Sequence, residues 1–203
     1  MPVCHQHGAA GYCSGTRCSP VVHAEQVGNQ IGRMTTDGKF TEFPVPTANS
    51  TPLGLAVGPD KMLWFTERAA SKIARITFDG QVTEFPLPNA NSGPTRLITG
   101  PDGTIWFAEF GGSRIGRITI DGKITEYPVP NAGPVCITVG SDKALWFTEY
   151  NGNKIGRMTT DGKITEYPVP TGSSHPILIA AGADGVIWFI EQASGKIGRL
   201  QIK

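Results

Sequence analysis

The chain has 203 residues, 18 Lys and Arg against 17 Asp and Glu, a net charge of +1 and 39% hydrophobic residues. This balance does not favour binding to nucleic acid or to acidic membranes. No apolar run approaches the ~20 residues of a membrane-spanning helix, and no signal-peptide core is visible. We therefore expect no nucleic-acid or membrane partner and a cytoplasmic location, where the 4 cysteines would stay reduced.

Residues 1–23 do not fit the pattern of the rest of the chain. We expect a poorly ordered leader there, and two other interpretations stay open. A misread or rearranged gene start would explain why Val22 and His23 stand where the later pattern asks for Trp and Phe. A metal site is the second alternative, although the usual Cys-x-x-Cys spacing of zinc sites is missing; its ligands would come from Cys4, His5, His7, Cys13, Cys18 and His23.

From residue 24 onward the chain repeats one unit. The stretch LWFTEYNGNKIGRMTTDGKITEYPVP at 145–170 recurs with small changes at 105–130 and at 63–88. A period of about 40 residues predicts a repeat architecture. It is marked by tryptophans spaced 42, 40 and 42 residues apart, at Trp64, Trp106, Trp146 and Trp188. The units are 24–50, which is partial, 51–92, 93–132, 133–174, and 175–203, which lacks the final segment.

Each complete unit predicts four short strands. An apolar strand follows a proline, a Trp-Phe-x-Glu strand comes second, and a Lys-Ile-Gly-Arg strand comes third. An Asp-Gly pair such as Asp121-Gly122 then predicts a hairpin turn, because Gly accepts a positive φ. The fourth strand carries prolines, which only an edge strand tolerates. The sequence therefore predicts an all-β fold, a β-propeller of four-stranded antiparallel blades with four clear repeats and one partial repeat.

The carboxylates occupy repeated positions, which is more typical of structural than of catalytic groups. We expect each second-strand Glu to pair with an Arg or Lys of the neighbouring third strand, as Glu67 with Arg75. The alternative is a ring of these Glu side chains around the central opening that holds a divalent cation. Glu149 and Glu191 are then the candidate metal ligands.

Ligand-binding residues are expected where the repeats differ. The positions after each inner-strand proline should surround one mouth of the central channel, and in one unit they are Thr95 and Arg96. Arg96 is the one unrepeated charge on an inner strand, so it contacts a ligand or forms a salt bridge. Phe110 and Tyr150 follow the second-strand Glu and either cover an apolar ligand or cap a blade.

The combined pattern WFTE, NKIGR-Ile/Met-T and DGKITEYPVP, over residues 24–203, resembles the streptogramin B (virginiamycin B) lyase family. The resemblance implies a seven-bladed β-propeller and a carbon–oxygen lyase that linearises cyclic streptogramin B depsipeptides, an antibiotic-resistance activity assisted by Mg²⁺. With fewer repeats, this chain looks like a partial or shortened member. An incomplete ring is expected to self-associate or to tighten into five blades, because open sheets expose edges and faces.

The family reaction needs a base that removes a proton alpha to a carbonyl, so that the ester C–O bond is eliminated. In the family that base is a His directly after the inner-strand proline, and no repeat here has one. The nearest is His175, just before Pro176, which is the candidate base. The family's magnesium-holding Glu does not carry over. The alternative function is a non-catalytic ligand- or protein-binding propeller, or a truncated copy without activity.

Overall fold

The computed structural model describes residues 28–202 and Ala24 with their side chains, and the backbone alone of residues 5–6, 9–10, 13–14, 17–18, 21–23 and 25. The alternatives proposed for residues 1–23 depend on side chains outside this described part, so they stay predictions. The described part contains no helix long and apolar enough to cross a membrane.

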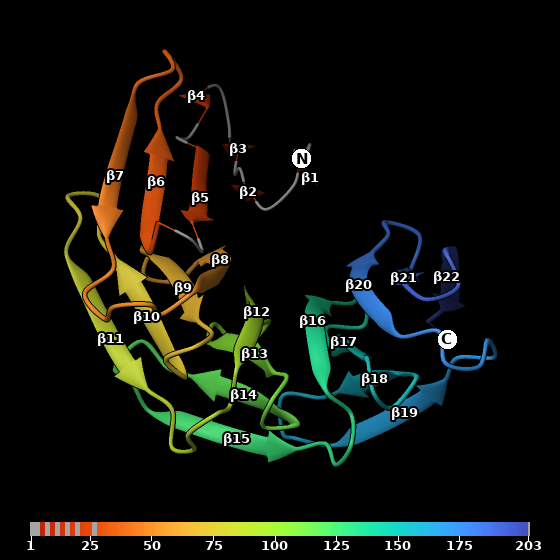
Figure 1. The fold of residues 1–203 in the computed structure, drawn as a ribbon. Coiled ribbons are helices and arrows are strands. Elements are labelled where there is room, and N and C mark those ends of the chain that lie inside the picture. The colour runs from red at the N-terminus through yellow and green to blue at the C-terminus, as the bar shows by residue number, and fades with distance from the viewer. Residues whose placement is uncertain are drawn as a thin grey trace.

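Five antiparallel sheets follow one another around a central axis and leave an opening between the first and the last (Figure 1). The first sheet runs in the order β1 (His5–Gln6), β2 (Ala9–Ala10), β5 (Val21–Glu25), β6 (Gln30–Met34) and β7 (Phe40–Pro44). Strands β3 (Cys13–Ser14) and β4 (Arg17–Cys18) pair only with each other. The second sheet contains β8 (Pro52–Val57), β9 (Leu63–Glu67), β10 (Lys72–Ile76) and β11 (Val82–Pro86).

The remaining sheets repeat this order from the axis outward. The third contains β12 (Pro94–Thr99), β13 (Ile105–Glu109), β14 (Arg114–Ile118) and β15 (Ile124–Pro128). The fourth contains β16 (Pro134–Val139), β17 (Leu145–Glu149), β18 (Lys154–Met158) and β19 (Ile164–Pro168). The last has three strands, β20 (Pro176–Ala181), β21 (Val186–Glu191) and β22 (Lys196–Gln201). The predicted all-β propeller with Pro-bearing edge strands is confirmed.

The core lies between successive sheets rather than inside any one of them. Adjacent residues of a strand point to opposite faces, so Trp106 packs against the following sheet and Phe107 against the preceding one. We call the tryptophan side of a sheet its front face and the other side its back face. The front face of each of the first four sheets packs on the back face of the next sheet, and Trp64, Trp106 and Trp146 are 0–1% exposed as a result.

At the edge of this core, each buried tryptophan donates a hydrogen bond to a carboxylate that also forms an ion pair. The Trp106 Nε1–H donates to Asp102 at 3.0 Å, and the same carboxylate pairs with Arg117 at 3.1 Å. The guanidinium of Arg117 also lies 5.6 Å from the centre of the Trp106 ring. The same Trp–Asp–Arg arrangement recurs in the second and fourth sheets. Indole burial is therefore compatible with a satisfied N–H.

The expected pairing of Glu67 with Arg75 is wrong. Antiparallel register places Glu67 opposite Lys72 and Arg75 opposite Trp64, at the other end of the strand pair. Arg75 instead reaches Asp60 in the turn before the tryptophan strand, with Nη1 at 3.3 Å from Oδ2. Strand register therefore decides which carboxylate the Arg contacts. The alternation of side-chain direction along one strand does not reveal this register.

The expected tightening into a five-blade ring does not occur. Trp188 on the front face of the last sheet is 40% exposed, against 1% for its counterpart Trp146. In a closed ring that face would pack on the back face of the first sheet. The first and last sheets instead lie on either side of the opening (Figure 1).

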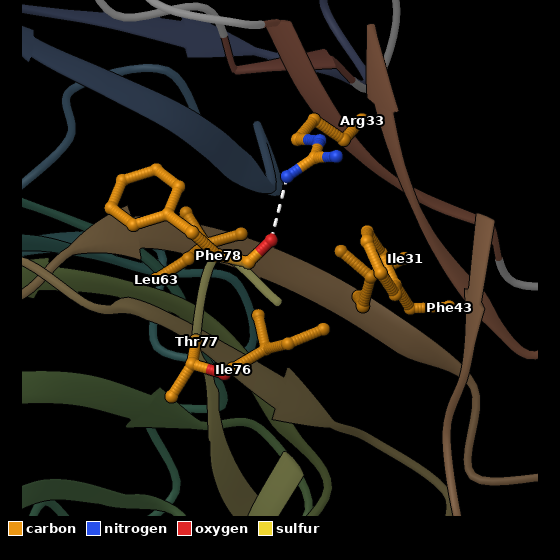
Figure 2. A pocket seen from close by; sticks show the side chains of 7 residues that line it. All are labelled: Ile31, Arg33, Phe43, Leu63, Ile76, Thr77 and Phe78. Atoms are coloured by element: carbon orange, nitrogen blue, oxygen red, sulfur yellow. Dashed lines mark hydrogen bonds between the residues drawn. The ribbon is translucent and has the colours of Figure 1, made fainter. Parts of the chain in front are cut away.

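An apolar cavity of about 40 Å³ marks the one described interface that lacks a tryptophan (Figure 2). Arg33 and Phe43 of the first sheet border it, as Arg75 and Phe85 border Trp64 in the second. Across the cavity lie residues of the second sheet and its hairpin turn, including Phe78, whose carbonyl accepts a 2.6 Å hydrogen bond from Arg33 (Figure 2). The register places residue 22 opposite Arg33, as Trp64 is opposite Arg75.

We expect Val22→Trp to fill this cavity and to raise the free energy of unfolding by about 1 kcal/mol, since cavity-filling changes commonly add about 0.5–2 kcal/mol. Thermal melting followed by circular dichroism measures the change. Val57→Trp adds the same side chain at a position that is 41% exposed and should give no gain. An unchanged or lower melting temperature for Val22→Trp would show that the cavity is not a vacated tryptophan position.

Candidate functional site

A cleft of about 340 Å³ opens at one end of the inner strands, and two sets of repeat positions line it. Inner strands and tryptophan strands meet at this end, where Pro94 pairs with Glu109. One set follows the inner-strand prolines and the other follows the second-strand Glu. The first set is Leu53, Thr95, Arg96, Val135, Ile177 and Leu178, and the second is Arg68, Phe110, Tyr150 and Gln192. The four predicted ligand-binding residues, Thr95, Arg96, Phe110 and Tyr150, therefore line the same cleft.

The cleft is cationic. Arg68 and Arg96 are the charged side chains among its described lining residues, and no carboxylate accompanies them. Neither arginine forms an ion pair within the described part of the chain. The alternative of a salt bridge for Arg96 is thus not observed, and its charge is available to a ligand. The guanidinium of Arg68 lies 6.0 Å from the centre of the Phe110 ring, within cation–π range.

Three rings form a continuous row beside the cleft. Phe110 meets Tyr150 edge to face with ring centres 6.0 Å apart, and Tyr150 stacks on His175 with ring centres 4.5 Å apart. The rings come from the third, fourth and last repeats, so the tertiary structure alone brings them together. Offset or edge-on contacts of this kind fix ring orientation. The row presents flat apolar surface next to the two arginines.

Thr95 contributes mainly to the scaffold under the cleft. Its side chain is only 4% exposed, and its hydroxyl donates to the Val135 carbonyl of the next inner strand at 2.7 Å. The Thr95 carbonyl in turn accepts a 2.8 Å hydrogen bond from the Thr66 hydroxyl of the preceding sheet. These hydrogen bonds join neighbouring sheets and stabilise the spacing of the inner strands around the axis.

His175 lies behind Tyr150 and is not among the residues that line the cleft. Its Nδ1 is 3.0 Å from the Tyr150 carbonyl oxygen. A protonated Nδ1 donates to that carbonyl, which leaves Nε2 as the unprotonated nitrogen of the neutral ring. The φ of His175 is +49°, and the equivalent positions Gly93 and Gly133 have φ of +55° and +53°. His175 therefore has the left-handed backbone conformation that two other repeats place at a Gly.

The two candidate metal ligands are buried away from the cleft. Glu149 is 1% exposed and its Oε1 has no partner among the described residues, whereas Glu191 accepts a 2.9 Å hydrogen bond from Ser194. No group of three His, Cys, Asp or Glu side chains in the described part of the chain could hold a metal ion. The described residues do not fit the Mg²⁺ that the family resemblance implies.

Burial raises the pKa of three second-strand carboxyl groups, those of Glu67, Glu109 and Glu149, to about 7. The two carboxylate oxygens of Glu109 are buried and have no hydrogen-bond partner among the described residues, so ionisation there would leave a charge unsolvated. The negative charge of Glu126 on the outer strand adds to the increase. These carboxyl groups are thus held close to their protonation midpoint at neutral pH.

We expect the free energy of unfolding to fall as the pH rises from about 4.5 to about 7. In this range the folded chain holds protons on Glu109 and its counterparts that the unfolded chain, with an ordinary pKa of 4.5, has released. Glu109→Gln removes one ionisation and should increase stability at pH 8 by on the order of 2–3 kcal/mol. Melting temperatures at pH 5.5 and pH 8 measure it, and the exposed Glu42→Gln is the control. An equal pH dependence for all three proteins would contradict the prediction.

The chain is similar to known proteins in sequence and in fold. Residues 16–203 match the virginiamycin B lyase family. A catalytically inactive histidine-to-alanine variant of virginiamycin B lyase from Staphylococcus aureus, solved with quinupristin, is 46% identical with a TM-score of 0.88, over 90% of this chain and 63% of that one. Selenomethionine-substituted virginiamycin B lyase from Staphylococcus aureus is 42% identical with a TM-score of 0.84, over 91% of this chain and 67% of that one.

A streptogramin B lyase structure is 40% identical with a TM-score of 0.83, over 91% of this chain and 65% of that one. The chain therefore spans 63–67% of the length of these three relatives. The comparison with curated proteins gave no match.

Proposed function

The chain belongs to the virginiamycin B lyase family, and from this membership we propose that its cleft binds a cyclic streptogramin B depsipeptide and opens it as a carbon–oxygen lyase. One observation carries the proposal. The positions at which the repeats differ converge on one cleft, where Phe110 and Tyr150 supply aromatic surface. Arg68 and Arg96 supply positive charge there and have no ion-pair partner among the described residues. A relative with 46% identity was solved with a streptogramin, quinupristin.

The cleft suits a large, mostly uncharged ring. Its volume of about 340 Å³ is within the range of small-molecule sites. Apolar side chains such as Leu53 and Ile177 line it beside the aromatic row, and a cyclic peptide already lacks most of the chain entropy that binding would remove. The arginines then orient ester and amide carbonyls, which are the polar groups of such a ring.

The proposed reaction is an elimination. A base takes a proton from the carbon adjacent to the one that carries the ester oxygen, the electron pair forms a C=C bond, and the C–O bond breaks to release a carboxylate. His175 is the candidate base, through Nε2, because its Nδ1 is directed to the Tyr150 carbonyl. Arg96 is suited to hold the carboxylate that leaves, since a charge-assisted hydrogen bond strengthens as that charge develops.

A non-catalytic binding function is the second candidate, and one observation favours it. His175 stacks on the cleft residue Tyr150 but does not itself line the cleft. Proton abstraction requires the base within hydrogen-bond reach of the substrate, or one water away. If Tyr150 keeps its position when ligand binds, the cleft holds the depsipeptide without opening it.

Incubation with a streptogramin B and Mg²⁺ separates the two candidates. The elimination leaves the mass unchanged, so a chromatographic shift together with a new fragmentation pattern identifies the opened product. We expect product with the wild-type chain and none with His175→Gly. Glycine suits the φ of +49°, so this variant should fold as well as the wild type. Product from both proteins would exclude His175 as the base. If neither protein gives product, the lyase proposal is wrong and the non-catalytic binding function is the one supported.

We expect Tyr150→Ala and Arg96→Ala each to weaken depsipeptide binding by about tenfold or more, because each removes a main contact of the cleft. Isothermal titration calorimetry measures the dissociation constant whether or not the ring is opened. Lys123→Ala is the matched charge control, since Lys123 is exposed in a hairpin turn away from the cleft. Unchanged affinity in both cleft variants would place the ligand elsewhere.

A further inference from the structure

Among the described residues Arg33 has no carboxylate partner, unlike its counterparts in the second, third and fourth repeats. Those counterparts, Arg75, Arg117 and Arg157, each form an ion pair with an Asp of the preceding turn, at 3.3, 3.1 and 2.7 Å. Arg33 forms no such pair in the described part of the chain. Its Nε is buried and has no hydrogen-bond partner among the same residues. A buried charged donor without an acceptor is costly, so this position favours an anion from solution.

The sequence explains why the first repeat lacks this ion pair. An Asp precedes each tryptophan strand, and Cys18 stands one period of 42 residues before the first of them, Asp60. The chain before β6 contains a single carboxylate side chain, that of Glu25. Strand register pairs Glu25 with Gln30, which is three residues, or about 10 Å, from Arg33 along β6. The first repeat therefore has no acid at the position that pairs with the Arg in the later repeats.

Arg33 borders the apolar cavity of about 40 Å³ between the first two sheets (Figure 2). A single water molecule needs about 10–15 Å³, so the cavity has room for roughly three or four non-hydrogen atoms. Ile31, Leu63 and Ile76 provide apolar walls, and Arg33 is the one charged side chain among the described lining residues. The cavity therefore suits a small molecule that is anionic at one end and apolar at the other.

Two contacts orient the guanidinium of Arg33 at this cavity. Its Nη1 donates to the Phe78 carbonyl at 2.6 Å, as Nη1 of Arg75 donates to the Ile120 carbonyl at 2.9 Å. The guanidinium carbon also lies 5.3 Å from the centre of the Phe43 ring. Neither contact uses Nε. A guanidinium that is already oriented favours a carboxylate, because the planar arrangement of its N–H donors matches the two carboxylate oxygens.

We propose that this cavity binds a short-chain monocarboxylate, with its carboxylate on Nε of Arg33 and its alkyl group against Ile31 and Leu63. The fourth repeat shows the contact that is reproduced, since Nε of Arg157 donates to Oδ2 of Asp142 at 2.7 Å. Acetate carries the same carboxylate on one carbon as an Asp side chain. The site lies where β9 begins and the ligand cleft lies where that strand ends, so the proposal does not depend on lyase activity.

Nuclear magnetic resonance of the arginine Nε–H groups tests the site in the full chain. Sodium acetate is added to the isotopically labelled protein at neutral pH, and sodium chloride is reduced so that ionic strength stays constant. We expect the Arg33 resonance, assigned by its loss in Arg33→Lys, to shift and to saturate. Half-saturation should be on the order of 1–10 mM, because a ligand of so few atoms binds weakly. The Arg157 resonance is the internal control and should not move, because its Nε already donates to Asp142.

Two variants and a larger acid locate the site. Val22→Trp fills the cavity and should abolish the acetate shift, whereas Val57→Trp adds the same side chain at a position that is 41% exposed and should preserve it. Transfer of magnetisation from the protein to the acetate methyl group should be lost in Arg33→Gln as well. Pivalate has the same charge but a bulkier alkyl group, so it should give no shift at the same concentration.

Four results would overturn the proposal. The first is an Arg33 resonance that does not move at any acetate concentration, and the second is an equal shift of the Arg157 resonance, which would indicate a general effect of salt. The third is an equal shift with sodium chloride alone, because the site would then not select a carboxylate. The fourth is an acetate shift that persists in Val22→Trp or that pivalate reproduces, because the anion would then bind outside the cavity.

Discussion

The packing of one sheet's front face on the next sheet's back face is the interaction on which the structure depends. No single four-stranded sheet here encloses a core, so the apolar side chains of each are removed from water only by its neighbours. In the three interfaces that contain a tryptophan, this residue is the largest fully buried side chain, and the Asp at its edge accepts the indole N–H while pairing with an Arg. Stability is therefore shared between neighbours, and an interface without its tryptophan contains a cavity.

This dependence on neighbours also explains how a repetitive scaffold acquires a specific site. Core positions must stay alike because every sheet has to fit both neighbours. The positions after the inner-strand prolines and after the second-strand Glu face the axis at one end of the sheets. They do not pack between two sheets, so their side chains can differ from repeat to repeat. There the chain places Arg68, Phe110 and Tyr150 at equivalent positions of successive units, and one cleft receives three different side chains. The aromatic row and the two cleft arginines are the result.

The packing of sheet on sheet also buries carboxyl groups, and this makes the stability of the structure depend on pH. Glu109 and its counterparts sit where a tryptophan strand meets the following loop, and burial leaves them with a pKa of about 7. Protonation removes the charge that the interface cannot solvate. A feature repeated in every complete sheet thus makes the whole array sensitive to pH, whereas a single such group would affect one interface only.

Much of the fold could be predicted from the sequence because its signals are local and repeated. The period of 40–42 residues, the Asp-Gly turns and the prolines on the outer strand each report backbone geometry directly, and the propeller followed from them. The same logic indicated that Thr95, Arg96, Phe110 and Tyr150 are positions where repeats diverge. The four residues line one cleft, and their contacts with a ligand stay a prediction.

Only the tertiary structure decided which side chains contact one another across strands and sheets. Strand register directs Arg75 to Asp60 and leaves Glu67 buried, with no hydrogen-bond partner for its carboxylate in the described part of the chain. The sequence pattern of one strand does not contain this information. The stacking of His175 on Tyr150 depends on a turn from one unit reaching a loop of another. Sequence determines what each unit is, because local backbone preferences are encoded residue by residue. Which side chains meet depends on how the units stack, because those contacts join residues tens of positions apart.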